Sequence, residues 1–135
     1  GLRFSFYTAS LREAHPNTAV LEVRDAAGRT LTLQAASTGG GRIRVDRLNG
    51  VDVSFTGMFN TLVVQHQDIA GKVADVTRAL SSAKINIANM SVCRDRRGGD
   101  ALMVIETDQK VPPVVRVLIG ELRGIRSLTY YEKEE

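Results

Sequence analysis

The residues with the clearest chemical potential are His66 and Asp68, in the run His66-Gln67-Asp68-Ile69-Ala70-Gly71. Apolar residues 62–64 precede this run. Residues after it recur at the spacing of a helix face: Val73, Val76, Thr77, Leu80 and Ala83. The run therefore indicates a tight turn between a strand and a helix. The first N–H groups of such a helix are unpaired and favour a carboxylate or phosphate.

An amino acid fits this turn physically. Its carboxylate would lie on the N–H groups near residues 70–72 and its ammonium near Asp68. Asn86, on the next predicted strand, could add a side-chain contact. Two structural roles remain open: His66 as a histidine at the sheet rim with a satisfied hydrogen bond, and Asp68 as the helix N-cap.

A second feature is the glycine-rich segment Ser37-Thr38-Gly39-Gly40-Gly41. Three consecutive glycines let a backbone adopt positive φ or approach another group closely. One reading is a loop whose exposed N–H groups cradle a substrate. The other is a flexible hairpin connection. It is not a phosphate-binding P-loop, because no Gly-Lys-Ser/Thr follows.

No catalytic set stands out elsewhere in the sequence. There is no Cys/His pair at ligand spacing, no dinucleotide fingerprint in context and no nucleophile elbow. Cys93, the only cysteine, fits a small packing residue, and one cysteine cannot hold an iron–sulfur cluster or a structural zinc. His15 is a lone histidine before Pro16, in a turn, where a structural role is the simpler reading.

Composition indicates one ordinary domain or two small ones. The chain has 135 residues, of which 43% are hydrophobic and 24% charged, as a packed core requires. No apolar run approaches the roughly 18 residues of a membrane span, and no signal peptide is visible. Without an internal disulfide, a reducing, cytoplasmic setting is expected. The net charge of +3, with arginines beside acids and 5% aromatic residues, favours a solvated surface over nucleic-acid binding.

Residues 1–56 read as strands and loops only. The predicted strands are residues 2–8, 20–24, 30–34, 42–48 and 51–55. Residues 25–28 form a predicted hairpin turn, and Asn49-Gly50 is a strong hairpin signal. The first residue is not Met and the chain opens in strand-like sequence, so we expect structure upstream. This segment is too small to bury a good core alone.

Residues 60–135 predict a β-α-β-β-α-β order, the ferredoxin-like arrangement, with two helices on one face of a four-stranded antiparallel sheet. The predicted helices are residues 71–83 and the segment from Pro112 to Gly124, with the stripe Val115, Leu118, Ile119 and Leu122. The strand over residues 84–94 changes its apolar phase after Ile87, which indicates a bulge. Residues 101–108 are apolar on both faces, so the free sheet face needs a cover. We expect a homodimer or segment 1–56 there.

Residues 60–135 resemble the ACT domain, a βαββαβ regulatory module that binds amino acids. The usual signature is a strand, Asp/Asn-x-Pro-Gly, a helix and Ile-Asn-Ile. Here it is Asp68-Ile69-Ala70-Gly71 and Ile85-Asn86-Ile87, with Ala70 in place of proline. In serine-binding members, contacts come from positions matching His66, Asp68 and Asn86, and Asp68 stands where asparagine is common. The candidate ligand-binding residues are His66, Asp68, Ile69, Ala70, Gly71, Asn86 and Ile87.

Residues 1–56 resemble the C-terminal part of the allosteric-substrate-binding domain in the β subunit of iron–sulfur L-serine dehydratases. The resemblance rests on His15-Pro16-Asn17-Thr18-Ala19, the glycine-rich segment and Asn49-Gly50. It implies a fragment that is not catalytic alone and a catalytic α subunit or domain that carries a [4Fe–4S] cluster. His15 and Asn17 would face the substrate site, and residues 37–41 would line it. The reaction is deamination of L-serine to pyruvate and ammonia.

The expected function is therefore a regulatory and substrate-binding portion of this dehydratase. It would bind L-serine or another small amino acid and form a homodimer, with no nucleic-acid or membrane partner. Two alternatives remain. One is the C-terminal regulatory region of a D-3-phosphoglycerate dehydrogenase, a family with related domains, and the other is a dimerisation module without ligand.

Overall fold

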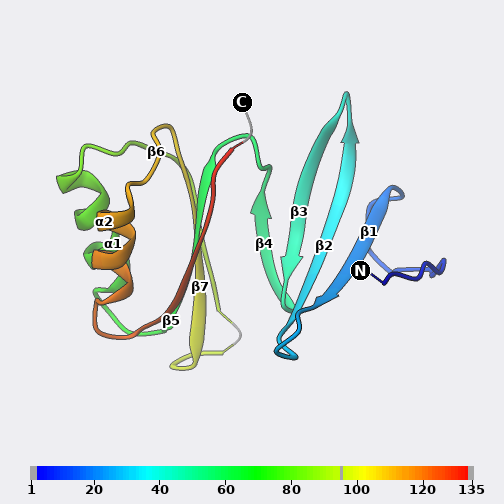
Figure 1. Cartoon of the computed structure of the whole chain (residues 1–135), viewed down its shortest axis with the longest axis horizontal. Coiled ribbons are helices and arrows are strands. Elements are labelled where there is room, and N and C mark those ends of the chain that lie inside the picture. The colour runs from blue at the N-terminus through cyan, green and yellow to red at the C-terminus, as the bar shows by residue number, and fades with distance from the viewer. Residues whose placement is uncertain (1–2, 95, 134–135) are drawn as a thin grey trace.

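The computed structural model of the chain describes residues 3–94 and 96–133. Two four-stranded antiparallel sheets follow one another along the chain, and two helices cover the second sheet (Figure 1). The N-terminal sheet contains β1 (Thr18–Arg24), β2 (Thr30–Gly39), β3 (Arg42–Leu48) and β4 (Val51–Phe55). The C-terminal unit contains β5 (Asn60–Gln67), α1 (Lys72–Ser82), β6 (Ile87–Arg94), β7 (Asp100–Thr107), α2 (Pro113–Gly120) and β8 (Ile125–Tyr131).

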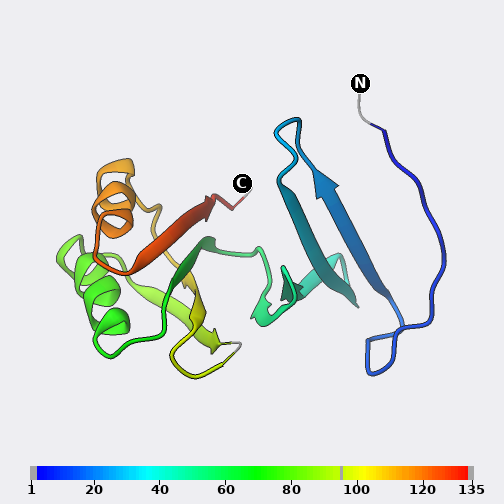
Figure 2. The same cartoon turned by 90° about the horizontal axis from the view of Figure 1, so that it is seen from below.

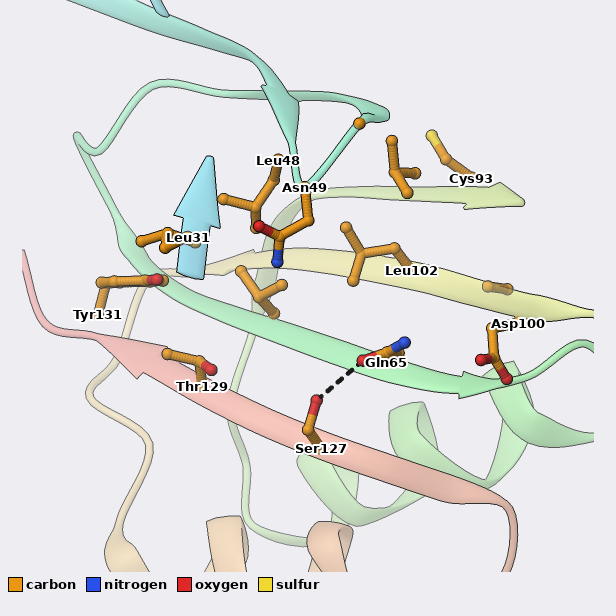
Figure 3. Close-up of a pocket in the computed structure, with 14 residues that line it drawn as sticks. Leu31, Leu48, Asn49, Gln65, Cys93, Asp100, Leu102, Ser127, Thr129 and Tyr131 are labelled. Atoms are coloured by element: carbon orange, nitrogen blue, oxygen red, sulfur yellow. Dashed lines mark hydrogen bonds between the residues drawn. The ribbon is translucent and has the colours of Figure 1, made fainter. Parts of the chain in front are cut away.

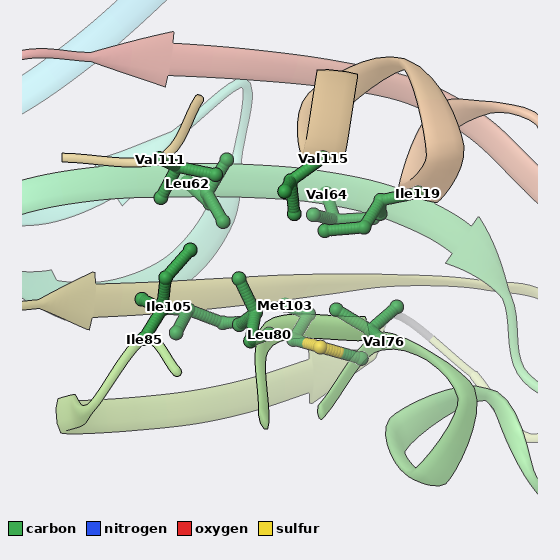
Figure 4. Packing of buried hydrophobic residues seen from close by; sticks show 10 residues of the cluster. All are labelled: Leu62, Val64, Val76, Leu80, Ile85, Met103, Ile105, Val111, Val115 and Ile119. Atoms are coloured by element: carbon green, nitrogen blue, oxygen red, sulfur yellow. The ribbon is translucent and has the colours of Figure 1, made fainter. Parts of the chain in front are cut away.

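The C-terminal unit has the strand order β6-β7-β5-β8, which confirms the predicted ferredoxin-like βαββαβ fold. Its core lies between the sheet and the helices, where Leu62 and Val64 of β5 pack with Val76 and Leu80 of α1 (Figure 4). All four side chains are completely buried. The sheet is therefore apolar on the helix side, as the sequence pattern predicted.

The predicted bulge in β6 is also present. The register between β6 and β7 shifts between Ile87 and Asn89. The strand begins at Ile87, three residues later than expected. The N–H groups of Lys84 and Ile85 still donate to carbonyl oxygens of α1, and that of Asn86 donates to Gln109 Oε1.

The buried stripe of α1 differs from the prediction in the first turn. Val73, which belongs to the predicted stripe, is 38% exposed, whereas Lys72, which does not, is 7% exposed. Its Nζ donates hydrogen bonds to Asp75 Oδ2 at 2.7 Å and to the Arg123 carbonyl oxygen at 2.6 Å. A lysine can therefore be buried here because its ammonium keeps two partners.

The stripe prediction also failed at the helix ends. Ala83, predicted in the α1 stripe, is exposed at the C-cap. On α2, Val115 and Ile119 are buried as predicted, whereas Leu118 is 52% exposed. The helix ends at Gly120 instead of Gly124, so the last predicted turn of the stripe is not helical.

The N-terminal sheet consists of consecutive hairpins in the order β1-β2-β3-β4. In the first hairpin, which joins the strands predicted at residues 20–24 and 30–34, Leu21 lies opposite Leu33. The turn between β3 and β4 is formed by Asn49 and Gly50, with φ of 49° and 79°. Two positive φ values in a two-residue connection are what this dipeptide favours.

The predicted strand over residues 2–8 is not formed in its described part. Residues 3–8 have no strand partner among the described strands, and the side chains of Phe4, Phe6 and Tyr7 are 75%, 89% and 90% exposed. Alternation predicts which face a strand would bury, but a strand also needs a neighbour for its backbone hydrogen bonds. Leu2, the first apolar residue of this pattern, lies outside the described residues.

The N-terminal sheet packs on the face of the C-terminal sheet opposite to the helices (Figures 1 and 2). Val63 and Val104 of this far face join the buried side chains of the other sheet, Val45, Leu48, Val53 and Phe55. Of the two covers expected for this face, the structure shows segment 1–56. The division into domains at residues 56–60 stays a prediction, although the strands of the two sheets change over between Phe55 and Asn60.

Glu106 of β7 ties the connection between the sheets to the C-terminal unit. Its side chain is 3% exposed. Its Oε1 accepts hydrogen bonds from the Thr56 backbone N–H at 3.0 Å and the Thr56 hydroxyl at 3.3 Å. Its Oε2 accepts one from Asn89 Nδ2 at 3.1 Å. One buried carboxylate thus joins the linker, β7 and the edge strand β6.

Neither helix in the described part of the chain has the length and apolar character needed to cross a membrane.

Candidate functional site

The turn between β5 and α1 is placed as predicted, at the end of the central strand β5. Gly71 is the N-cap of α1, with φ 91°, and no side chain caps the helix. The helix therefore begins with its first N–H groups not satisfied by a capping side chain, as the anion-binding reading requires.

Asp68 does not cap the helix, so that reading was wrong. Its Oδ2 instead accepts hydrogen bonds from Arg94 at 3.0 Å and from the Gly98 N–H at 3.1 Å, both in the β6–β7 hairpin. The Asp68 N–H donates to the Gly99 carbonyl oxygen at 2.8 Å. The Gly98 amide, followed by the Arg94 guanidinium, lowers the pKa of the Asp68 carboxyl. Asp68 is thus a carboxylate that an ammonium could reach in competition with Arg94.

His66 is buried on the helix side of the sheet and is not a rim residue, since it is 2% exposed. Its Nδ1 lies 2.9 Å from the Gln67 carbonyl oxygen, which can only accept, so Nδ1 carries the proton. Nε2 is then an acceptor, and it has no partner among the described residues. A buried acceptor without a partner is costly, and a donor such as a hydroxyl would satisfy it.

The turn is braced from the other side by the α2–β8 connection. The Gln67 N–H donates to the Gly124 carbonyl oxygen at 2.8 Å, and Lys72 Nζ donates to the Arg123 carbonyl oxygen. Gly124 has φ 86°, and a Cβ there would lie 3.4 Å from Lys72 Cδ and 3.7 Å from Ile69 Cδ1. Gly124 therefore allows both the turn and the close approach of Ile69 and Lys72.

Asn86 lies at the opposite end of the sheet from Asp68. Its Nδ2 donates to Asp108 Oδ2 at 2.6 Å and its N–H to Gln109 Oε1 at 2.7 Å, beyond the end of β7. Asp68 contacts Arg94, the last residue of β6, whereas Asn86 precedes its first residue, Ile87. With 8 residues at roughly 3.3 Å each, β6 separates the two side chains by about 26 Å. One chain therefore does not bring Asp68 and Asn86 together.

His15 and Asn17, the candidate substrate contacts, are exposed and precede β1 in the N-terminal sheet. His15 Nδ1 accepts a hydrogen bond from the Asn17 N–H at 3.2 Å, and the His15 carbonyl oxygen accepts one from the Thr18 hydroxyl at 2.6 Å. These contacts build the local turn. A role in substrate contact stays a prediction.

The glycine-rich segment forms the tip of the β2–β3 hairpin. Ser37 and Thr38 belong to β2, and Gly39, Gly40 and Gly41 have φ of 91°, 62° and 75°. A Cβ at any of these glycines would meet nothing within 4 Å, so the tip is open to solvent. The geometry fits the hairpin connection, and the substrate-cradling role of residues 37–41 stays a prediction.

Sequence reasoning missed the partners that hold the turn in place. Arg94 and Gly98 lie 26 and 30 residues after Asp68. Arg123 lies 51 residues after Lys72. No local pattern links residues so far apart. The paired glycines 98–99 are typical of a turn, but they do not indicate that the Gly98 N–H binds Asp68.

The residues present do not fit an iron–sulfur cluster. Such clusters are held by several cysteine thiolates, and Cys93 is the only cysteine of the chain. In residues 3–94 and 96–133, no three His, Cys, Asp or Glu side chains gather into a group that could hold a metal ion. No chemistry through a cluster is therefore derived for these residues.

The C-terminal unit and the N-terminal sheet both have known relatives. Residues 60–119 match the family model of the ACT domain, in agreement with the βαββαβ order of the C-terminal unit. The chain is 33% identical over 129 residues to the probable L-serine dehydratase beta chain of Bacillus subtilis (strain 168). It is 22% identical over 130 residues to the L-serine dehydratase beta chain of Peptoniphilus asaccharolyticus.

Each of these two alignments covers 96% of this chain, and the chain spans 58% and 57% of the two relatives. A D-3-phosphoglycerate dehydrogenase of Bacillus subtilis (strain 168) is 32% identical over 90 residues, which are 58% of this chain and 17% of that protein. The resemblance stated from the sequence is confirmed. The ACT domain and the beta-chain relatives together indicate a regulatory role.

Proposed function

We propose that the chain is the regulatory and substrate-binding portion of an iron–sulfur L-serine dehydratase, whose ACT domain binds a small amino acid such as L-serine. The observation that carries this proposal is the similarity to two dehydratase beta chains across 96% of this chain, which includes the N-terminal sheet. The beta-chain names imply an alpha chain as catalytic partner. That partner would hold the [4Fe–4S] cluster, for which this chain lacks ligands.

The amino acid would lie at the start of α1. Its carboxylate would accept hydrogen bonds from the first helical N–H groups, which no side chain caps. Its ammonium would approach Asp68 and replace part of the Arg94 contact at 3.0 Å. The hydroxyl of L-serine would donate to His66 Nε2, which has no partner among the described residues. Because His66 is 2% exposed, binding would require residues 67–71 to move. This movement would transmit the effect of ligand binding from the turn to the rest of the fold.

Asn86 would reach this ligand from a second copy of the chain. Among the described strands, β6 pairs with β7 only, so its other edge is free for a partner. Two β6 edges paired antiparallel would place the Arg94 end of one strand beside the Ile87 end of the other. Asp68 of one copy would then face Asn86 of the other. A dimer of this kind accounts for two predicted ligand contacts that lie about 26 Å apart in one chain.

A mixing experiment tests both the ligand and the shared site. Asp68→Ala and Asn86→Ala are made separately and L-serine binding is measured for each protein and for an equimolar mixture after subunit exchange. Neither variant alone should bind, and the mixture should recover sites, because each mixed dimer has one intact pair. A mixture that binds no more L-serine than the separate variants would contradict the shared site. Wild-type protein that binds no amino acid would contradict the ligand as well.

The dehydrogenase alternative is favoured by the relative at 32% identity and by the ACT domain itself. The complete gene decides between the two: a dinucleotide-binding glycine motif upstream would favour the dehydrogenase. Suitably spaced cysteines in a neighbouring gene would favour the dehydratase. A dimerisation module without ligand predicts a stable dimer by light scattering whose melting temperature no amino acid raises.

A further inference from the structure

A cleft of about 410 Å³ lies between the two sheets, beside their apolar contact (Figure 3). Its floor is the far face of the C-terminal sheet, with Val63, Gln65, Leu102 and Ser127, and its wall is the β3–β4 turn with Leu48 and Asn49. Neighbouring side chains of a strand point to opposite faces, so Gln65 faces this cleft while His66 faces the helices. The cleft is therefore separate from the α1 turn.

Asn49 is held rigidly at the wall. Its N–H donates to the Thr32 carbonyl oxygen at 2.7 Å, and its Oδ1 accepts from the Thr32 N–H at 3.0 Å. These two bonds fix both the left-handed backbone and the plane of the carboxamide. Figure 3 shows the Asn49 amide nitrogen directed away from the wall, towards the floor. The fold thus presents an oriented hydrogen-bond donor to the cleft.

The floor combines an apolar strip with polar groups. Val63 is 6% exposed, and Leu102 packs against the same cluster. Beside this strip, Ser127 Oγ donates to Gln65 Oε1 at 3.4 Å, a long hydrogen bond that a ligand group could replace. A molecule in the cleft would therefore meet apolar side chains and uncharged hydrogen-bonding groups at once.

The charge of the lining restricts the ligand further. Asp100 is the one carboxylate among the lining residues, and Arg126 lies 3.6 Å from it. No lysine, arginine or histidine belongs to the described lining. A ligand carboxylate or phosphate would thus lose water without gaining a cationic partner, which is unfavourable.

We infer that this cleft is a second ligand site, for a small uncharged molecule that carries an amide or hydroxyl group beside an apolar group. The volume is within the 300–1,000 Å³ that is usual, as an order of magnitude, for such sites, which often lie between domains. Because the ligand contacts both sheets, its binding stabilises their contact.

The test uses two probes that differ at one end. N-acetyl-L-leucinamide is uncharged, and N-acetyl-L-leucine ends in a carboxylate. Both are titrated into the whole chain labelled with ¹⁵N, and amide shifts are recorded. The uncharged probe should shift signals of Leu48, Asn49, Gln65 and Leu102 and bind at least about tenfold more tightly than the acid.

The variant Asn49→Asp keeps the acceptor for Thr32 and removes the donor, so it should weaken the uncharged probe about tenfold. Ser81→Asp, on the exposed surface of α1, adds the same charge as a control and should change nothing. Ser127→Phe fills the cleft from an exposed position and should block binding even if Asn49→Asp fails to fold. Equal binding of both probes, shifts elsewhere in the chain, or binding that survives Ser127→Phe would overturn the inference.

Discussion

Removal of the Glu106 carboxylate is expected to loosen the connection between the two sheets. Glu106→Ala deletes the acceptor for the Thr56 N–H and hydroxyl and for Asn89 Nδ2. Glu106→Gln keeps an oxygen for Thr56 but turns a donor towards Asn89. Glu106→Ala should therefore lower the free energy of unfolding more than Glu106→Gln does.

The magnitude follows from the burial of the three residues. Glu106 is 3% exposed, but Thr56 and Asn89 are exposed and can be rehydrated in part. Hydrogen bonds to a charged group contribute about 1.5–3 kcal/mol each when buried, so partial rehydration leaves about 2 kcal/mol for Glu106→Ala. Glu106→Gln loses one of these partners and should cost about 1 kcal/mol or less.

The assay is urea unfolding followed by circular dichroism, with hydrogen exchange of the Thr56 amide as a local reading. Glu22→Ala, at an exposed position of β1, is the control and should stay within about 0.5 kcal/mol of wild type. The Thr56 N–H should exchange faster in Glu106→Ala only. If the free energy of unfolding and the Thr56 exchange rate are both unchanged in Glu106→Ala, then Glu106 does not hold the connection between the sheets to the C-terminal unit.

Three further predictions concern the core and the turn. Leu80→Ala, at a completely buried position of α1, should lose about 2–5 kcal/mol, whereas Val73→Ala should lose about 1 kcal/mol or less; equal thermal midpoints would rule out the packing of α1. Gly124→Ala should cost about 1–3 kcal/mol because it places a Cβ at φ 86° and 3.4 Å from Lys72 Cδ, and a wild-type urea midpoint would contradict this. The pKa of Asp68 is lowered on folding by the Gly98 amide and Arg94, so its stabilisation is present above the unfolded-state pKa and lost as pH falls through the folded one. The stability gap between wild type and Asp68→Asn should accordingly narrow on acidification, and a gap independent of pH would contradict it.

Local sequence signals predicted most of the fold. Asn49-Gly50 located a hairpin because few dipeptides tolerate two positive φ values. The phase change after Ile87 located the β6 bulge, because side-chain alternation cannot change phase without an extra residue. Two apolar faces on β7 predicted that something covers the far face of the sheet, and segment 1–56 does so.

The failures arise where distant residues decide a local outcome. Lys72 can be buried because its ammonium donates a hydrogen bond to the Arg123 carbonyl oxygen. No residue close to Lys72 in the sequence indicates that partner. Residues 3–8 alternate like a strand but lack a neighbour among the described strands. One of the two roles left open for Asp68 was the helix N-cap, yet the β6–β7 hairpin holds its carboxylate.

The candidate site was predictable in its position, and also in being incomplete within one chain. The strand-to-helix turn lies where the apolar patterns placed it. The predicted β-α-β-β-α-β order already implied that Asp68 and Asn86 lie at opposite ends of the sheet. The crossover through α1 makes β5 and β6 parallel, so the end of β5 and the start of β6 cannot meet within one chain. The distance between the two ends is what leads to a site shared between copies.

Calorimetric titration of L-serine into the wild-type chain tests the central claim most directly. The account predicts saturable binding at one site per chain and its loss in Asn86→Ala, with the dimer retained by light scattering. No heat with L-serine or any other standard amino acid, from a folded dimeric protein, would contradict an amino-acid site at the start of α1.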